Sequence, residues 1–202
     1  MKTIISIQML FLSLFLTAQE TVIPLENFWH MDNPIDNVYY KDVNNILDKY
    51  IGDWVIDDGT HYLKLQIEKQ EHILIGGGSF KYTNYEDRLI VKFVYKLNGV
   101  EQYNTLNGER LFIVGSLISS ANSNIVKFHY TEPSLIDCFR TIDGRLSLEF
   151  ITDGTLTPIG EAPSGTLNWK RKKNAFGHRP IDGSCEDTSD FIIPHDLTLE
   201  RE

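Results

Sequence analysis

The feature that most constrains this chain is the alternation of apolar and polar residues over long segments. Its clearest example is "DRLIVKFVYKL", which places on one face Leu89, Val91, Phe93, Tyr95 and Leu97. A period of two is typical of a β-strand with one buried face. Asn98-Gly99 follows, a pair that accepts the positive φ angles of a tight turn, and "VEQYNTL" then returns. The segment predicts a β-hairpin.

The same alternation recurs along the rest of the chain. "HYLKLQIEK" alternates through Leu63, Leu65 and Ile67, and "CFRTIDGRLSLEFI" predicts a second hairpin that turns at Asp143-Gly144. Further strands are expected in "RLFIVGSLI", "NIVKFHYT", "GTLNWKRK" and "DLTLERE". About 8–10 short strands predict an all-β, antiparallel protein, and a closed barrel would remove the exposed strand edges. A two-sheet β-sandwich is the alternative.

Residues 38–51 have a different period. Tyr39, Val43, Ile46 and Tyr50 recur at spacings of four, three and four, with Leu47 beside them. This pattern predicts one short amphipathic helix before the first strand, ended by Gly52. Residues 19–37 carry two prolines and show no period, so they are expected to form a loose leader. Residues 38–202 are then expected to form a single domain, because nothing resembling a linker divides them.

The first 18 residues predict export. Lys2 precedes an apolar stretch and the small pair Thr17-Ala18, the order found in secretory signal peptides. The stretch is shorter than the about 20 apolar residues of a membrane span; a retained N-terminal anchor is the alternative. Cleavage after Ala18 would remove Lys2 and leave an acidic protein without a transmembrane segment, in the periplasm, on the outer surface or in the medium. The acidic balance argues against nucleic acid as a partner.

Cys138 and Cys185 are the only cysteines. In an oxidising compartment they could form one disulfide, or they could be two small buried side chains. No Cys-x-x-Cys pair occurs, and the six histidines are dispersed without the spacing of metal ligands. No metal and no cofactor is therefore expected.

No catalytic motif is present either. The chain lacks Gly-x-Ser-x-Gly, His-Glu-x-x-His, a Walker loop and a dinucleotide fingerprint. Cys138 lies at an expected strand entrance rather than at a helix start, which would lower a thiol pKa. The acidic stretch 182–190 does not have EF-hand spacing, so a solvated loop is favoured over a Ca²⁺ site. The protein is not expected to be an enzyme.

Aromatic residues supply the remaining functional hypothesis. Those expected on inward strand faces are Phe93, Tyr95, Tyr103, Phe128 and Tyr130. A ligand cavity uses such apolar walls with a few hydroxyl groups, although a filled core would use them too. We therefore expect non-catalytic binding of a small, partly apolar ligand. The alternative is an interaction protein with a packed core, whose working surface lies near the basic residues 170–173, with their charges in water.

The short expected helix followed by Gly52, Asp53 and Trp54 resembles the start of the lipocalin-like superfamily. The resemblance implies that Gly52 and Trp54 are structural, with the Trp packed across the closed end of a barrel. It also implies an arginine over that Trp, for which Arg171 is the candidate. More closely, "ILDKYIGDW", "YEDRLIVKFVYKLNGVEQYNTL" and "FIIPHDLTLERE" resemble a family of exported bacterial proteins with a domain of unknown function, which brings no assigned activity or ligand.

Overall fold

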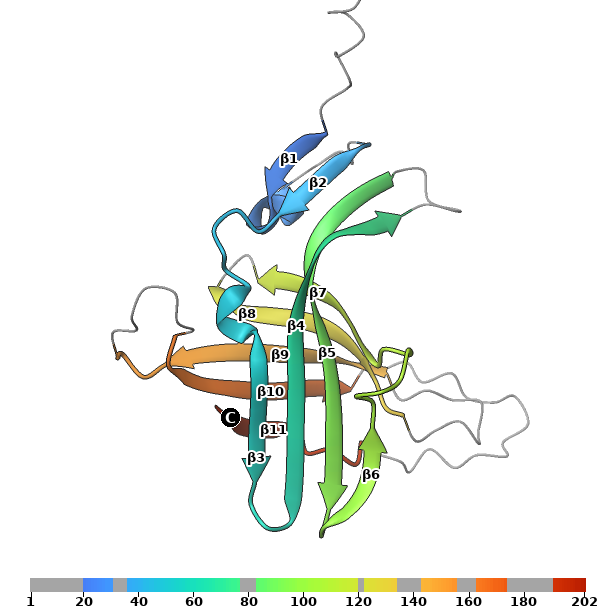
Figure 1. The fold of residues 1–202 in the computed structure, drawn as a ribbon, viewed down its shortest axis with the longest axis vertical. Coiled ribbons are helices and arrows are strands. Elements are labelled where there is room, and N and C mark those ends of the chain that lie inside the picture. Colours follow the sequence, from blue (N-terminus) through green and yellow to red (C-terminus); the bar gives the residue numbers. More distant parts are fainter. Residues whose placement is uncertain are drawn as a thin grey trace, which may run out of the picture.

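A computed structural model describes residues 20–30, 36–76, 83–119, 122–133, 143–155, 163–173 and 191–202. Eight of its strands close into an antiparallel barrel (Figure 1). These strands are β3 (Gly52–Asp57), β4 (His61–Gly76), β5 (Thr83–Leu97), β7 (Ile113–Ser119), β8 (Asn122–Thr131), β9 (Asp143–Thr152), β10 (Gly165–Lys173) and β11 (Asp196–Arg201). The other elements are β1 (Thr21–Pro24), 3₁₀ helix η1 (Leu25–His30), β2 (Val38–Lys41), 3₁₀ helix η2 (Asp48–Tyr50) and β6 (Val100–Asn104).

Two seams close the ring. At the first, β11 pairs with β3 through Glu200 opposite Val55 and Arg201 opposite Trp54. At the second, β5 pairs with β7 through Val91 opposite Ile113. The prediction of an all-β, antiparallel barrel is thus confirmed, its form is consistent with a lipocalin-like barrel, and the sandwich alternative is not the arrangement found.

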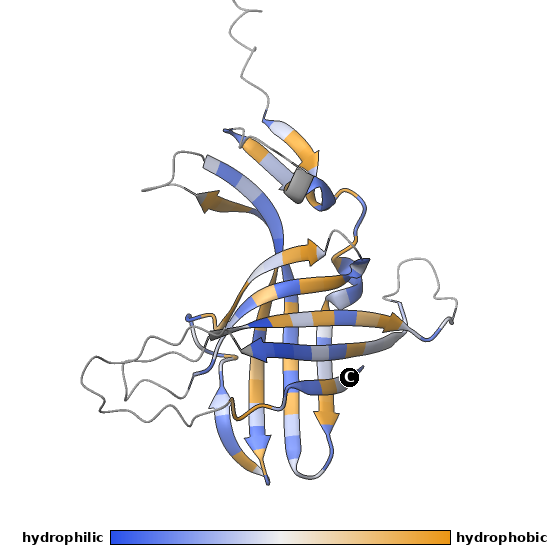
Figure 2. Cartoon of the chain, turned by 180° about the vertical axis from the view of Figure 1, so that it is seen from behind, coloured by the Kyte–Doolittle hydropathy of each residue, from blue (hydrophilic) through white to orange (hydrophobic). Residues whose placement is uncertain are grey.

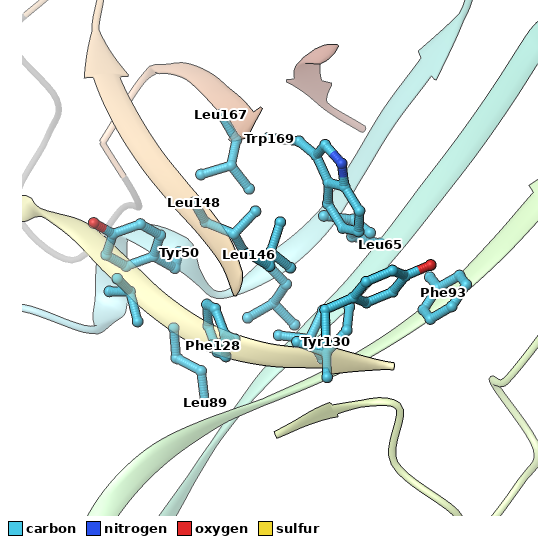
Figure 3. Packing of buried hydrophobic residues seen from close by; sticks show 14 of the residues in the cluster. Tyr50, Leu65, Leu89, Phe93, Phe128, Tyr130, Leu146, Leu148, Leu167 and Trp169 are labelled. Atoms are coloured by element: carbon cyan, nitrogen blue, oxygen red, sulfur yellow. The ribbon is translucent and has the colours of Figure 1, made fainter. Parts of the chain in front are cut away.

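The barrel interior holds the hydrophobic core. Along the strands, apolar and polar residues alternate, as Figure 2 shows, and Figure 3 shows the inward side chains packed together. The inward residues predicted on three strands are at most 4% exposed: Leu63, Leu65, Ile67, Leu89, Val91, Phe93, Tyr95, Leu146, Leu148 and Phe150. Leu97, at the end of its strand, is only partly buried. The period of two therefore identified the core correctly.

Beyond the barrel, β4 and β5 continue into an extension of the same sheet. There β5 pairs with β2 in parallel, and β2 pairs with β1 in parallel. We call this part the annex: β1, β2, residues 70–76 of β4 and residues 83–88 of β5 (Figure 1). A bulge between Gln70 and Ile73, with His72 at φ 55°, marks where β4 leaves the barrel. Extra residues in one strand bend it and increase its twist, which separates the annex from the barrel.

The predicted amphipathic helix is wrong. Residues 38–41 form β2, and within residues 38–51 only η2 is helical. The Asp42 carboxylate accepts the backbone N–H groups of Ile46 (2.8 Å) and Leu47 (3.1 Å), and Asn45 has φ 53°. Because these bonds and the pairing of β2 with β5 satisfy the backbone, a helix is not needed. Gly52 does have a positive φ, 122°, but as the first residue of β3.

Two further expectations also need correction. The leader 19–37, expected to be loose, contains β1 and η1, with the Phe28 ring 4.8 Å from the Tyr40 ring. Asp143-Gly144 is not a turn but the start of β9, paired with β8 and β10. Gly144 is required there by close packing, since a Cβ atom would lie 2.7 Å from the carbonyl oxygen of Lys172.

Candidate ligand site at one end of the barrel

Four of the five aromatic residues predicted to line a ligand site meet at one end of the barrel. Phe93 lies 6.5 Å from Tyr103 and 6.3 Å from Tyr130, and Tyr95 lies 6.2 Å from Tyr103, measured between ring centroids. These separations lie in the outer part of the 4.5–7 Å range of aromatic pairs. Phe128 is also buried, but it lies nearer the middle of the barrel beside Leu89, as Figure 3 shows. We call the four the aromatic cluster.

A buried ion pair adjoins the aromatic cluster. Nη1 of Arg171 lies 3.1 Å from Oε2 of Glu132, and both side chains are at most 1% exposed. The same carboxylate oxygen accepts a hydrogen bond from the hydroxyl of Tyr130 at 2.8 Å. The guanidinium of Arg171 stacks on the ring of Phe191, 3.7 Å from its centroid. The expectation that the charges of the basic cluster lie in water is therefore wrong for Arg171.

Residues 191–195 cross this end of the barrel. Side chains of the barrel hold this segment by hydrogen bonds to its backbone carbonyl groups. The hydroxyl of Tyr95 donates to the carbonyl of Ile192 (3.2 Å), and Nε1 of Trp169 donates to that of Pro194 (3.2 Å). The guanidinium of Arg171 donates to the carbonyl of Ile193. Since each of these donors comes from the barrel interior, the crossing segment and the aromatic cluster form one unit.

The barrel wall beside the aromatic cluster is made by a short strand. β6, which carries Tyr103, pairs with β5 through Tyr95 opposite Tyr103 and three further residue pairs. Within the described residues, no strand pairs with the other side of β6. A strand with one neighbour opens at lower cost than a strand held on both sides, because fewer ladder hydrogen bonds must break. The wall next to Tyr103 therefore depends on the pairing with β5 alone.

The hydroxyl groups of Tyr95 and Tyr130 stay protonated well above neutral pH. Burial, followed by the charge of Glu132, raises the pKa of both Tyr95 and Tyr130. Nδ1 of His61 lies 2.7 Å from the hydroxyl of Tyr95, so a second polar group is available beside the ring. Chemically, the site offers apolar ring faces, hydroxyl groups and one shielded ion pair.

The raised tyrosine pKa values give a testable pH dependence. Burial raises the pKa of five of the chain's nine tyrosines: Tyr39, Tyr40, Tyr50, Tyr95 and Tyr130. Because the folded-state pKa lies above the unfolded value of about 10, their contribution to stability is complete below that pH and is lost as the pH rises further. In a titration followed by tyrosinate absorbance and circular dichroism, we expect at least five tyrosines to ionise only as the protein unfolds. Smooth ionisation of all tyrosines near pH 10 in folded protein would contradict the burial.

The other end of the barrel is closed around Trp54. This side chain is fully buried, and its Nε1 donates to the carbonyl of Tyr50 at 2.8 Å. The arginine over its ring is Arg201, at 4.2 Å, and not Arg171 as the lipocalin-like resemblance implied. Arg201 also donates to the carbonyls of Ile51 (2.5 Å) and Lys49 (2.8 Å). The structural roles expected of Gly52 and Trp54 fit this arrangement.

Several sequence-based predictions concern residues outside the described part of the chain. They are the signal peptide at 1–18, the acidic stretch 182–190, and Cys138 with Cys185. Among the described residues, no three His, Cys, Asp or Glu side chains are grouped closely enough to hold a metal ion. No described helix has the length and hydropathy required to cross a membrane.

Glu132 and Arg201 were missed from the sequence, and Arg171 was assigned to Trp54 rather than to Glu132. Glu132, Arg171 and Arg201 each continue the inward alternation of their strand or of the residues just after it, behind Tyr130, Trp169 and Leu199 respectively. The alternation of inward and outward residues could therefore have indicated that these side chains point inward.

The comparisons with known proteins identify a family but no function. No curated protein and no solved structure shows significant similarity to the chain. A family model does match, and it spans residues 1–202. The chain therefore belongs to DUF6705, a family of unknown function.

Proposed function

We propose that this protein acts outside the cytoplasm as a non-catalytic binding protein for a small, partly apolar ligand. The single observation that carries the proposal is the meeting of Phe93, Tyr95, Tyr103 and Tyr130 at one end of the barrel. Export rests on the signal-peptide pattern of residues 1–18. The binding site is the aromatic cluster.

The chemistry of the aromatic cluster suits such a ligand. Binding sites combine apolar walls with a few polar groups that fix orientation. Here the ring faces supply the wall, and the hydroxyl of Tyr95 with Nδ1 of His61 supplies polar contacts. The ion pair of Arg171 and Glu132 holds the floor rigid, because each charge is satisfied by the other and by nearby groups.

Entry beside Tyr103 would require the displacement of one short strand, β6. β6 is five residues long and has one strand neighbour among the described residues. Its outward displacement would move the ring of Tyr103 from those of Phe93 and Tyr95, which it contacts at 6.2–6.5 Å. A ligand would then occupy the space between the rings, with its polar end towards His61.

Native mass spectrometry of protein purified gently from its host tests the proposal. We expect an additional, stoichiometric mass that is lost on denaturation. Tyr103→Leu is expected to reduce the retained fraction by about tenfold, since one wall of the site is removed. The matched control is Tyr50→Leu, a buried tyrosine on the other side of the core (Figure 3), which should leave the retained fraction unchanged.

Two results would overturn the proposal. One is a bare mass for the purified protein that stays bare after incubation with lipid and metabolite extracts of the host. The other is a bound mass that Tyr103→Leu and Tyr50→Leu reduce equally, because the loss would then follow stability rather than the site.

A further inference from the structure

The annex has an apolar strand edge that no described strand covers. β4 pairs with β3 only as far as Ile67 opposite Gly52, yet β4 continues to Gly76. Beyond the bulge its partner is β5 alone, through pairs that include Leu74 opposite Tyr85. Its other edge therefore has no strand partner among the described residues along 73–76. Such an edge is a template for another strand.

An apolar row leads across the annex to this edge. Val22 lies opposite Tyr39, Tyr39 opposite Tyr85, and Tyr85 opposite Leu74, so the four side chains share one face. Leu74 is 52% exposed at the edge. The ring of His72 stacks on Tyr85 with centroids 4.1 Å apart. A strand added to β4 would extend this row and cover Leu74.

Two other free edges of the described chain, those of β1 and β6, are protected. In β1, the N–H of Thr21 points towards β2, where it bonds to the carbonyl of Asn37. By alternation, the nitrogen of Pro24 faces outward, and proline has no N–H to offer a further strand. β6 is short and carries Glu101. Natural sheets blunt their edges with such devices, whereas residues 72–76 of β4 contain no proline, lysine or carboxylate.

We propose that this edge of β4 pairs with the same edge of a second copy, in an antiparallel dimer centred on Leu74. In that register Leu74 faces its own counterpart, Ile73 faces Ile75, and His72 faces Gly76. No carboxylate or ammonium group is brought opposite another within the stretch, although the chain has a net charge of −9. Self-pairing of one edge is isologous and closes after two copies, which limits the assembly to a dimer.

Sedimentation equilibrium of the purified protein at rising concentration tests the proposal. We expect the wild-type mass to approach twice that of the monomer. Leu74→Lys should weaken the association by more than about tenfold, because an edge lysine repels its counterpart. Since Leu74 is half exposed, its replacement should leave the circular dichroism spectrum and the melting temperature unchanged.

Val100→Lys is the matched control, because Val100 is 62% exposed in β6, away from the annex. It adds the same charge and should dimerise like the wild type. A wild-type protein that stays monomeric at every concentration would refute the dimer. So would a Leu74→Lys variant that associates as tightly as Val100→Lys.

Discussion

Replacing Arg171 with Met is expected to lower the free energy of unfolding by about 3–5 kcal/mol. The change leaves the carboxylate of Glu132, which is 1% exposed, without its opposite charge. It also removes the guanidinium bond to the carbonyl of Ile193, one of the contacts that hold the segment crossing the barrel end. Urea unfolding followed by tryptophan fluorescence would measure the effect.

Lys170→Met is the matched control for this variant. Lys170 is adjacent in β10 but faces outward, where its ammonium group lies 3.1 Å from Glu149. Exposed pairs of this kind contribute about 0–1 kcal/mol. In the double variant Glu132→Gln/Arg171→Met, no uncompensated charge remains, so part of the lost stability should return. If Arg171→Met were no more destabilising than Lys170→Met, the account of a buried ion pair would be wrong.

Trp54→Ala is expected to cost about 3–5 kcal/mol, through lost burial and the cavity left behind. The indole is fully buried, lies 6.2 Å from Phe150, and carries the guanidinium of Arg201 above its ring. Because Arg201 pairs across the seam between β11 and β3, the loss should also weaken the closure of the barrel.

The control for Trp54→Ala is Tyr62→Ala, on the outer face of the neighbouring strand. Tyr62 contacts the ammonium group of Lys96, 5.0 Å from its ring centroid. An exposed cation–π contact is worth about 0.5–1 kcal/mol, so this variant should unfold close to the wild type. An almost unchanged melting curve for Trp54→Ala would contradict the closure of the barrel around this residue.

The barrel was predictable because its information is local. A period of two fixes which side chains point inward, and the hairpin at Asn98-Gly99 follows from two residues with φ 51° and 77°. Phe93, Tyr95 and Tyr103 were placed correctly by that alternation alone. Their contact across β5 and β6 follows from the register of the hairpin.

The helix was mispredicted because its stabilising partners are distant in sequence. Tyr39 fits a helical spacing, yet Tyr39 and the neighbouring Asp42 are both fixed by Asp87 on β5. The hydroxyl of Tyr39 donates to Asp87 at 2.5 Å, and the N–H of Asp42 donates to it at 2.9 Å. Hydrogen bonds across more than 40 residues leave no periodic signal, so the sequence pattern described a structure that tertiary contacts override.

The pairing of Arg171 with Glu132 was not predicted, for another reason. Glu132 and Arg171 each follow an inward aromatic residue by two positions, so the alternation places them on the inward face. Charged residues, however, are expected in water unless they are paired. Each residue reveals its partner only when β10 and the segment after β8 come together in the barrel. Arg201 likewise contacts a residue that is distant in sequence, because Trp54 lies in the first strand of the barrel and Arg201 in the last.

A crystal structure of the protein purified gently from its host tests the binding claim most directly. We predict additional electron density between the rings of Phe93, Tyr95 and Tyr103, with β6 displaced outward to accommodate it. Rings that remain in mutual contact, with no density beyond the protein's own side chains, would contradict the account and leave the barrel as a solid core.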